Sequence, residues 1–411
     1  MKALIELGVL GLILTVAACG ESGPPEEPPS SSSPDQAADP SRSGALETVA
    51  TLELETTYPE GFSFLNGVRE LSDGTLLAAD PLAEVLLHID LDTGATDTLG
   101  RPGPGPQEYK QPDQVFPLPG DSSLLVDLGK MQLTEIEPDG SFGAGIPMAM
   151  QTEGRFPMIL HPRFVDALGR LYDRAPRARE GRAQDSVAII RFHPATQALD
   201  TVAMLWSPRV EQVRSRGGGL VPRMLEARNG WAVGDDGRVA IIQAEDFSVE
   251  WLLPDGWVVH GPSNPVPLHQ TGTAEKEAVV AGMGSSGISM TSVSSPSGGV
   301  QEMTMRRGIS RPGDGPTIDD FQWAETLPLF RSDRAVVSPL GELWIERHLP
   351  EDSLPEIADF DEAGQLRGVE KLPPGRQLLG FGRGTDGLEV VYLARTDEFD
   401  LRWLERYGVV R

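Results

Sequence analysis

Short apolar runs, rather than long helical stretches, dominate the chain from about residue 47 onward. Runs of Val, Leu, Ile and aromatic residues are separated by Asp-Gly, Pro-Gly and Asn-Gly pairs. The stretch Val68 to Asp80, "VRELSDGTLLAAD", is typical, and it leads into Glu84 to Gly94, "EVLLHIDLDTG". This pattern predicts many short antiparallel strands that are joined by tight turns.

The strand pattern recurs six times. Each unit has a strand, a glycine turn, a second strand, a variable loop, and then a third and a fourth strand joined by a turn. The glycines of the first turn are Gly74, Gly120, Gly169, Gly237, Gly341 and Gly387. Their spacings are 46, 49, 68, 104 and 46 residues, and the shorter ones match a four-stranded propeller blade of about 40–50 residues. We therefore predict an all-β fold, a six-bladed β-propeller over residues 47–411.

The spacing of 104 residues leaves room for either a long insertion or a seventh blade. This interval includes residues 271–300, whose first third predicts a helix that starts near Thr273. The remainder is rich in Gly, Ser and Met and has no clear pair of strands. We expect an insertion of helical or irregular structure at about residues 262–325, and seven blades remain the alternative.

A further strand is expected before the first unit. Residues Thr48 to Thr56, "TVATLELET", alternate between apolar and polar positions. A propeller leaves only short edges once its ring is closed. We therefore predict that this segment joins the last blade as its outer strand and locks the ring.

The beginning of the chain, "MKALIELGVLGLILTVAACG", resembles an export sequence. Lys2 gives a positive start, and the apolar core Leu7 to Val16 is too short to span a bilayer, so residues 1–18 are predicted to be a signal peptide. The segment Val16 to Cys19, "VAAC", resembles the lipobox of bacterial lipoproteins. That resemblance implies cleavage before Cys19 and a diacylglycerol on its thiol, and Gly20 at the next position favours the outer membrane or the cell surface.

Cys19 is the only cysteine of the chain, so no intramolecular disulfide can form, and a lone cysteine in an exported protein calls for an explanation such as lipidation. The alternative is an ordinary secretory signal in which Cys19 has no role. The following segment, Gly20 to Gly44, has no aromatic residue and no Leu, Ile, Val or Met. Such a composition cannot offset the entropy of ordering. Residues 19–46 are therefore predicted to be a disordered tether.

The charge of the chain narrows the classes of partner. There are 61 acidic and 35 basic residues, which gives a formal net charge of −26. This excess of negative charge argues against nucleic acid as a partner and against adsorption to anionic lipid headgroups.

The stretch Gly100 to Phe142 resembles an NHL repeat. The residues that match the pattern of that family are Gly105, Pro106, Glu108, Tyr109, Pro112, Val126, Asp127, Asp139 and Gly140. Gln107 departs from it, because glycine is usual at that position. The chain as a whole resembles the six-bladed, NHL-like propeller lipoproteins of bacteria, most of which have no assigned activity. Some similar propellers are lactonases, lyases or hydrolases that use a metal in the channel.

The glycine-rich stretch Leu99 to Pro112, "LGRPGPGPQEYKQP", also invites comparison with a phosphate-binding loop. Such a loop requires its glycines to lead into a helix N-terminus. Here four prolines intervene, no Gly-Lys-Ser/Thr follows, and a strand comes next. The related stretch Arg311 to Pro316, "RPGDGP", also precedes a unit. We interpret both stretches as rigid turns between blades.

Metal and nucleophile signatures are weak. Asp80, Asp127 and Asp173 end the second strands of three units, but Gln243, Arg347 and Leu393 interrupt the ring at the matching positions of the others. We interpret the aspartates as turn residues and predict no metal site and no cofactor, with calcium still open although no calcium loop is present. None of the six histidines forms a short metal-binding spacing. No Gly-x-Ser-x-Gly motif is found.

Three arginine clusters stand out in this acidic chain: Arg174, Arg177, Arg179 and Arg182; Arg209, Arg214, Arg216 and Arg223; and Arg306, Arg307 and Arg311. All lie in the suspected insertions or at their edges. Guanidinium groups bind carboxylate or phosphate through two parallel hydrogen bonds. We therefore assign a pocket for an anionic ligand to Arg174, Arg177, Arg179, Arg214, Arg216, Arg306 and Arg307. His161, in "ILHPRF", is the best histidine for a channel-facing role in it. The alternative is that these arginines only pair with the surplus acids.

These observations favour a lipid-anchored, extracytoplasmic propeller that acts as a ligand-binding or protein-interaction module. The expected partners are the membrane, through the N-terminal lipid, and an envelope protein, a glycan or a small anionic ligand, but not nucleic acid. The alternative is an enzyme, namely a propeller hydrolase, lactonase or lyase with a channel site. A binding role is favoured, because the fold alone implies no reaction.

Overall fold

The computed structural model describes residues 46–150, 158–175, 185–207, 212–214, 220–285, 287–294, 300–308, 317–384 and 387–411. These residues belong to one compact unit, Ala45–Arg411. The predicted signal peptide (1–18), the lipidation site Cys19 and the tether up to residue 45 lie outside the described residues.

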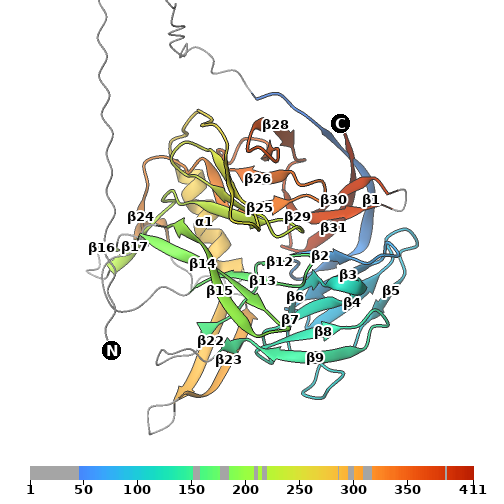
Figure 1. Cartoon of the computed structure of the whole chain (residues 1–411). Helices are drawn as coiled ribbons and strands as arrows, with labels where there is room; N and C mark the ends of the chain where they lie inside the picture. Colours follow the sequence, from blue (N-terminus) through green and yellow to red (C-terminus); the bar gives the residue numbers. More distant parts are fainter. Residues whose placement is uncertain are drawn as a thin grey trace, which may run out of the picture. The chain divides into compact units, whose positions relative to one another are not determined.

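Six four-stranded antiparallel sheets form the blades of a β-propeller (Figure 1). The first three are β2 (Val68–Glu70), β3 (Leu76–Asp80), β4 (Val85–Ile89) and β5 (Thr96–Thr98); β6 (Pro112–Pro117), β7 (Ser123–Asp127), β8 (Gln132–Ile136) and β9 (Phe142–Pro147); and β12 (Phe164–Val165), β13 (Leu171–Arg174), β14 (Ser186–His193) and β15 (Ala198–Trp206). The next two are β18 (Gly230–Val233), β19 (Val239–Ile242), β20 (Val249–Leu252) and β21 (Val258–His260); and β25 (Phe330–Val337), β26 (Leu343–Arg347), β27 (Glu356–Phe360) and β28 (Leu366–Lys371). The sixth contains β29 (Arg376–Arg383), β30 (Glu389–Thr396), β31 (Arg402–Val410) and β1 (Thr51–Phe62).

The glycine turns predicted from the sequence are present in all six blades. Each of the six glycines lies between the first and the second strand of its blade and has a positive φ, between 72° and 85°. L-amino acids with a Cβ rarely adopt this conformation. At Gly237 the space is closed as well, because an added Cβ would lie 2.2 Å from Nη2 of Arg170.

The ring closes through β1. This strand pairs antiparallel with β31, from Thr51 opposite Val410 to Phe62 opposite Arg402. The predicted outer strand of the last blade is therefore confirmed. Tyr58 on β1 is buried and its hydroxyl lies 2.9 Å from Oγ1 of Thr96, so β1 also contacts the first blade.

The residues just before β1 are bonded to the fifth blade. The amide of Val49 donates to the carbonyl of Val369 (3.2 Å), and the amide of Val369 donates to the carbonyl of Glu47 (2.9 Å). The amide of Ala50 donates to the carboxylate of Glu370 at 2.8 Å, and Glu370 is fully buried. The segment that enters the propeller thus connects its last two blades.

The glycine- and proline-rich loop of residues 99–111 joins the first two blades. The carboxylate of Glu108 accepts hydrogen bonds from the amide of Gly105 and from Nε of Arg101. Tyr109 is fully buried, and its hydroxyl accepts a hydrogen bond from the amide of Leu86 in the first blade. The interpretation of this stretch as an inter-blade turn is confirmed.

The 104-residue spacing holds an insertion rather than a seventh blade. Between β21 and β25 the described residues form the helix α1 (Thr273–Ser285), the hairpin of β22 (Gly287–Ser294) and β23 (Val300–Gly308), the short helix η2 (Ile318–Asp320) and β24 (Gln322–Trp323). β24 pairs in parallel with β17 (Leu220–Met224), which also pairs with β16 (Gln212–Arg214). A two-stranded sheet of β10 (Ala149–Met150) and β11 (Met158–Ile159) lies between the second and third blades in the sequence. The helix expected near Thr273 begins at that residue.

The core lies between neighbouring blades. One cluster combines Leu133 of the second blade with Phe192 of the third. Another combines Trp251 of the fourth blade with Phe360 of the fifth. Each sheet has two apolar faces, and radial stacking buries both of them.

Glu370 is expected to make the stability of the propeller depend on pH. Burial raises the pKa of Glu370 to about 7, and nearby Asp359 raises it further, while the amide of Ala50 opposes them. Because the pKa is higher in the folded than in the unfolded chain, this group's contribution to stability is lost as the pH rises from about 4.5 to 7. We expect Glu370→Gln to remove this loss, since a glutamine is neutral throughout.

The measurement is the melting temperature between pH 5 and pH 8, followed by circular dichroism. The decrease in melting temperature over this range should be smaller by several degrees in E370Q than in the wild type. The matched control is Glu53→Gln, which changes an exposed residue of β1 and should follow the wild-type curve. Parallel curves for E370Q and the wild type would refute the assignment.

Candidate functional site

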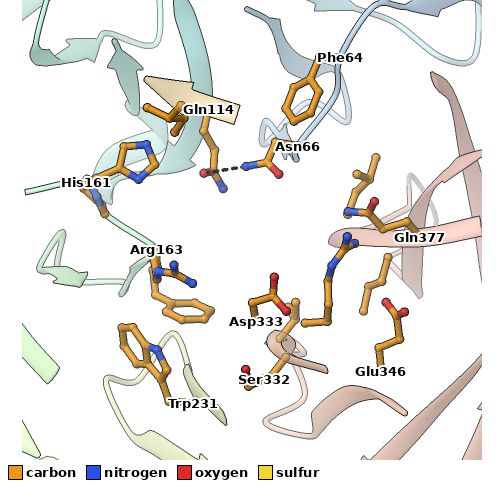
Figure 2. Close-up of a pocket in the computed structure, with 18 of the residues that line it drawn as sticks. Phe64, Asn66, Gln114, His161, Arg163, Trp231, Ser332, Asp333, Glu346 and Gln377 are labelled. Atoms are coloured by element: carbon orange, nitrogen blue, oxygen red, sulfur yellow. Dashed lines mark hydrogen bonds between the residues drawn. The ribbon is translucent and has the colours of Figure 1, made fainter. Parts of the chain in front are cut away.

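A cavity of about 640 Å³ lies on the axis of the propeller. Its wall is built largely from the first strands of the blades, which contact one another around the ring. We call it the axial cavity, and the residues discussed here as lining it are Phe64, Asn66, Gln114, His161, Arg163, Phe164, Trp231, Ser332, Asp333, Arg334, Gln377 and Arg402, with Arg307 from the insertion. Figure 2 shows side chains from around the ring pointing into one open space.

An irregularity in β25 brings charged residues to the cavity. Phe330 pairs with Arg347 and Ala335 pairs with Ile345, so residues 331–334 stand opposite the single residue Glu346. A bulge of this kind bends the strand and redirects its side chains. Here it places Ser332, Asp333 and Arg334 on the wall of the cavity.

Three arginines of the axial cavity have no acidic partner in the described part of the chain. No carboxylate there lies within 4.0 Å of the guanidinium group of Arg163, Arg334 or Arg402. Arg402 donates from Nη1 to the carbonyl of Leu65 at 2.6 Å. Burial lowers the pKa of Arg402 to about 10, and repulsion by Arg334 and Arg307 contributes. The group is therefore still charged at neutral pH.

Phe64 holds two guanidinium groups beside its ring. The Cζ of Arg402 lies 4.2 Å from the ring centroid, and that of Arg307 lies 4.4 Å from it. Both distances are within the range of cation–π attraction. The buried ring therefore fixes the orientation of two cations that would otherwise repel each other.

Arg307, unlike Arg402, is neutralised by an acid. Its Nε and Nη2 lie 2.5 and 3.0 Å from the two carboxylate oxygens of Asp113, which is almost fully buried. Nε2 of His161 lies 3.6 Å from the same carboxylate. Burial alone would raise the pKa of Asp113, but His161 and Arg307 outweigh it and hold the pKa below its usual value. Asp113 is thus the anion that balances these two side chains.

A second group of arginines lies by the third blade. Burial lowers the pKa of Arg174 to about 10, with a further contribution from Arg163 and a smaller one from Arg228. Asp173 and Asp333 oppose this shift, which places carboxylates near Arg174. Arg163 and Arg174 therefore lie close to each other and to two carboxylates, and Asp173 also interacts electrostatically with Arg163.

Neutral polar groups and aromatic rings complete the wall. Nδ2 of Asn66 donates to Oε1 of Gln114 at 3.4 Å, and Gln377 lies across the open space from them (Figure 2). Phe164 and Trp231 pack edge to face with their centroids 4.9 Å apart. A second cavity of about 740 Å³ shares Gln114, Arg163, Phe164, Val336 and Leu379 with the first, so the channel continues along the axis.

The insertion reaches this cavity from β23. The amide of Arg307 donates to Oε1 of Gln111 (2.8 Å), and Nε2 of Gln111 donates back to the carbonyl of Arg307 (3.0 Å). Together with the ion pair to Asp113, these bonds attach the β22–β23 hairpin to the second blade. Ile288 on β22 also lines the axial cavity.

The structure separates the arginines predicted from the sequence. Arg307 and His161 line the axial cavity, and Arg174 lies near Arg163. Arg306 instead pairs with Glu84 at 2.5 Å and lines a different cavity of about 520 Å³. Arg214 lies on β16. Arg177, Arg179 and Arg216 lie outside the described residues, as do Arg182, Arg209 and Arg311.

No sequence pattern predicted a role for Arg163, Arg334 and Arg402, or for the amides of Asn66, Gln114 and Gln377. Arg163 stands two residues after His161 in "ILHPRF", so the histidine pointed to the correct segment. Nothing in the sequence around Arg334 or Arg402 marks those residues, because each stands outside the arginine clusters.

The strand-end aspartates hold loops. Asp80 accepts hydrogen bonds from the amides of Ser63, Leu82 and Ala83. Asp127 accepts them from Lys110, Gln111 and Lys130, and Asp173 from His161 and Arg174. Asp80 and Asp127 thus bind amides of the turns that follow them, as predicted, whereas no such bond is seen for Asp173 among the described residues. Among the described residues, no group of three or more His, Cys, Asp or Glu side chains could hold a metal ion.

No protein-family model matches the sequence, and no curated protein matches it either. Solved structures do resemble it. A member of the DUF4221 family from Bacteroides vulgatus is 10% identical over 89% of this chain and 97% of that chain, with a TM-score of 0.48. A gluconolactonase from Xanthomonas campestris is 10% identical over 89% and 97%, with a TM-score of 0.38. A virginiamycin B lyase from Staphylococcus aureus is 10% identical over 88% and 100%, with a TM-score of 0.37.

These likenesses concern the fold alone, since the identities are far below 25%. The chain's own sheets establish the six-bladed propeller. In the described part of the chain, no helix is long and apolar enough to cross a membrane.

Asp113 is expected to hold the β22–β23 hairpin on the second blade. Asp113→Asn would leave Arg307 without its acidic partner, and breaking a buried ion pair costs about 3–5 kcal/mol. We expect amide hydrogen exchange in residues 300–308 to become at least about tenfold faster, while β30 and β31 keep their protection.

The matched control is Glu84→Gln, which removes the partner of Arg306, the neighbouring residue on β23. This pair is exposed, and such pairs contribute about 0–1 kcal/mol. Exchange in residues 300–308 should therefore change little in E84Q. Unchanged exchange in D113N would show that the hairpin is held by other contacts.

Proposed function

We propose that this chain is an extracytoplasmic propeller lipoprotein, related to the NHL-like propellers, that binds a small anionic ligand in its axial cavity. One observation carries the proposal. Arg163, Arg334 and Arg402 line the cavity without an acidic partner in the described residues, in a chain that has 61 acidic and only 35 basic residues.

Other arginines of the propeller illustrate the contrast. Arg376 and Arg395 both lie about 3 Å from the buried carboxylate of Glu405, and Arg347 lies 2.6 Å from Glu356. Buried or half-buried charges are normally paired, because desolvation of a lone ion is costly. An anion from solution would supply the partner that the chain does not provide to the three arginines.

Binding of an anion, without any reaction, is sufficient to explain the three arginines of the axial cavity. Guanidinium groups hold carboxylate or phosphate through paired, charge-assisted hydrogen bonds. The volume of the cavity, about 640 Å³, falls in the range of ordinary small-molecule sites. Since a fold by itself implies no reaction, catalysis is not part of the proposal.

Two features of the sequence support the proposed location. Residues 1–18 have the length and composition of a signal peptide, and the segment ending at Cys19 resembles a lipobox. Lipidation would also give the only cysteine of the chain a role. The axial cavity would then be exposed to envelope components, such as anionic glycan fragments, rather than to cytoplasmic metabolites.

The ligand proposal is tested by removing one guanidinium group. Thermal stability of the purified protein is measured with citrate, phosphate and sugar carboxylates at constant ionic strength, because binding to the folded state raises the melting temperature. Isothermal titration then gives the affinity of the best anion. In Arg402→Gln and Arg334→Gln we expect affinity to be about 10–100-fold lower, as for loss of a hydrogen bond to a charged group.

Arg306→Gln is the matched control, because it removes the arginine next to Arg307 on β23, which pairs with Glu84 outside the axial cavity. It should bind like the wild type. The proposal is wrong if no anion stabilises the protein, or if R402Q and R306Q have the same affinity.

The location is tested separately at Cys19. In a bacterial host that lipidates exported proteins, Cys19→Ser should abolish incorporation of labelled fatty acid and move the protein out of the membrane fraction. Ser22→Ala, three residues away in the sequence, should leave both unchanged. Membrane association that persists in C19S would argue against a lipid anchor.

A further inference from the structure

The unpartnered arginines of the axial cavity belong to opposite sides of the ring. Arg163 directly precedes β12 of the third blade, and Arg402 begins β31 of the sixth. The first strands contact one another in the order β29, β2, β6, β12, β18 and β25, so the third and sixth blades are three positions apart in a ring of six. Figure 2 likewise shows Arg163 facing Gln377 of the sixth blade across the open space.

The charge around each side is local. Arg402 interacts electrostatically with Arg334 and Arg307, whereas Arg174 interacts with Arg163 and Arg228. Arg307 is already balanced by Asp113. One side therefore offers Arg402 and Arg334 to a ligand. On the other side Arg163 interacts electrostatically with both Arg174 and Asp173, but among the described residues no carboxylate lies within 4.0 Å of its guanidinium group, so Arg163 is available to a ligand.

The wall of the axial cavity also carries neutral polar groups, beside the carboxylates of Asp333 and Glu346, the second of which pairs with Arg331 at 2.8 Å. Asn66 and Gln114 are joined by one long hydrogen bond of 3.4 Å, and the side-chain amide of Gln377 forms no hydrogen bond to another described residue. A side-chain amide offers both donors and acceptors. Such groups match hydroxyl groups, which also donate and accept.

We propose that the ligand is a dianionic polyol, a sugar-derived chain with a carboxylate at each end and hydroxyl groups between them. One carboxylate binds Arg402 and Arg334, and the other binds Arg163. Asn66, Gln114 and Gln377 bind the hydroxyl groups. This inference rests on the proposed function and adds the chemical class of its ligand.

The arrangement disfavours ligands with a single compact charge. A phosphate or a monocarboxylate can bind either Arg402 and Arg334 or Arg163, so the other side keeps the cost of an unpaired, partly desolvated cation. A diacid without hydroxyl groups can bind on both sides, but it displaces water from the amides without replacing those hydrogen bonds. A sugar diacid meets both requirements.

Three six-carbon probes separate these contributions. Galactarate has two carboxylates and four hydroxyl groups, galactonate lacks one carboxylate, and adipate lacks the hydroxyl groups. Titration calorimetry with the purified full-length protein should show galactarate binding at least about tenfold more tightly than either other probe. Galactarate binding no tighter than galactonate would overturn the two-carboxylate assignment, and binding no tighter than adipate would overturn the role of the amides.

Variants assign the ends of the ligand. Arg163→Gln should reduce the affinity for galactarate to about that for galactonate, and Asn66→Ala should reduce it towards that for adipate. Arg306→Gln should leave the affinity for galactarate unchanged. If R163Q lowers the melting temperature of the unliganded protein by many degrees, Arg163→Lys replaces it, since lysine keeps the charge and loses the paired geometry. An R163Q or R163K variant that binds galactarate like the wild type contradicts the proposal.

The outcomes also distinguish the two levels of inference. If citrate or phosphate binds in a manner that depends on Arg402 while galactarate does not bind, the sugar-diacid proposal fails and the anionic-ligand function stands. If no anion binds in a manner that depends on Arg402, both fail.

Discussion

The closure of the ring by β1 and β31 is the contact on which the rest of the structure depends. Each blade buries two apolar faces and needs a neighbour on either side. The first and last blades can meet only because a strand from the beginning of the body joins the end of the chain, with Thr51 opposite Val410. Tyr58 on that strand then contacts the first blade. The axial cavity exists only in the closed ring, because all six blades surround it.

Closure also explains why two kinds of arginine are found in one acidic chain. Arginines such as Arg376 and Arg395 lie within a blade and share the buried carboxylate of Glu405. They are paired by residues of their own sheet, whatever the other blades do. Arg163, Arg334 and Arg402 come from three different blades and meet only at the axis. Among the described residues no carboxylate lies within 4.0 Å of their guanidinium groups, and all three line the cavity.

This difference sets what could be predicted from the sequence. The turn at Gly74 and its five counterparts depends on φ, a property of one residue and its neighbours, and it was predictable. Alternation along Thr48 to Thr56 likewise predicted a closing strand. Arg306 and Arg307 show the limit: adjacent residues of a strand point to opposite faces, so only the register decides which one reaches Asp113. The β25 bulge that carries Arg334 has no comparable sequence pattern.

The insertion makes the site a property of distant parts of the chain. It leaves the propeller after the fourth blade, and its strand β23 is bonded to Gln111 and Asp113 of the second blade. Arg307 of that strand and Arg402 of the sixth blade lie beside the same ring, that of Phe64, which precedes the first blade. Asp113 compensates only the first of these two cations. The position of Arg402, and with it the uncompensated charge of the cavity, is therefore tied to the attachment of the insertion as well as to the closure of the ring.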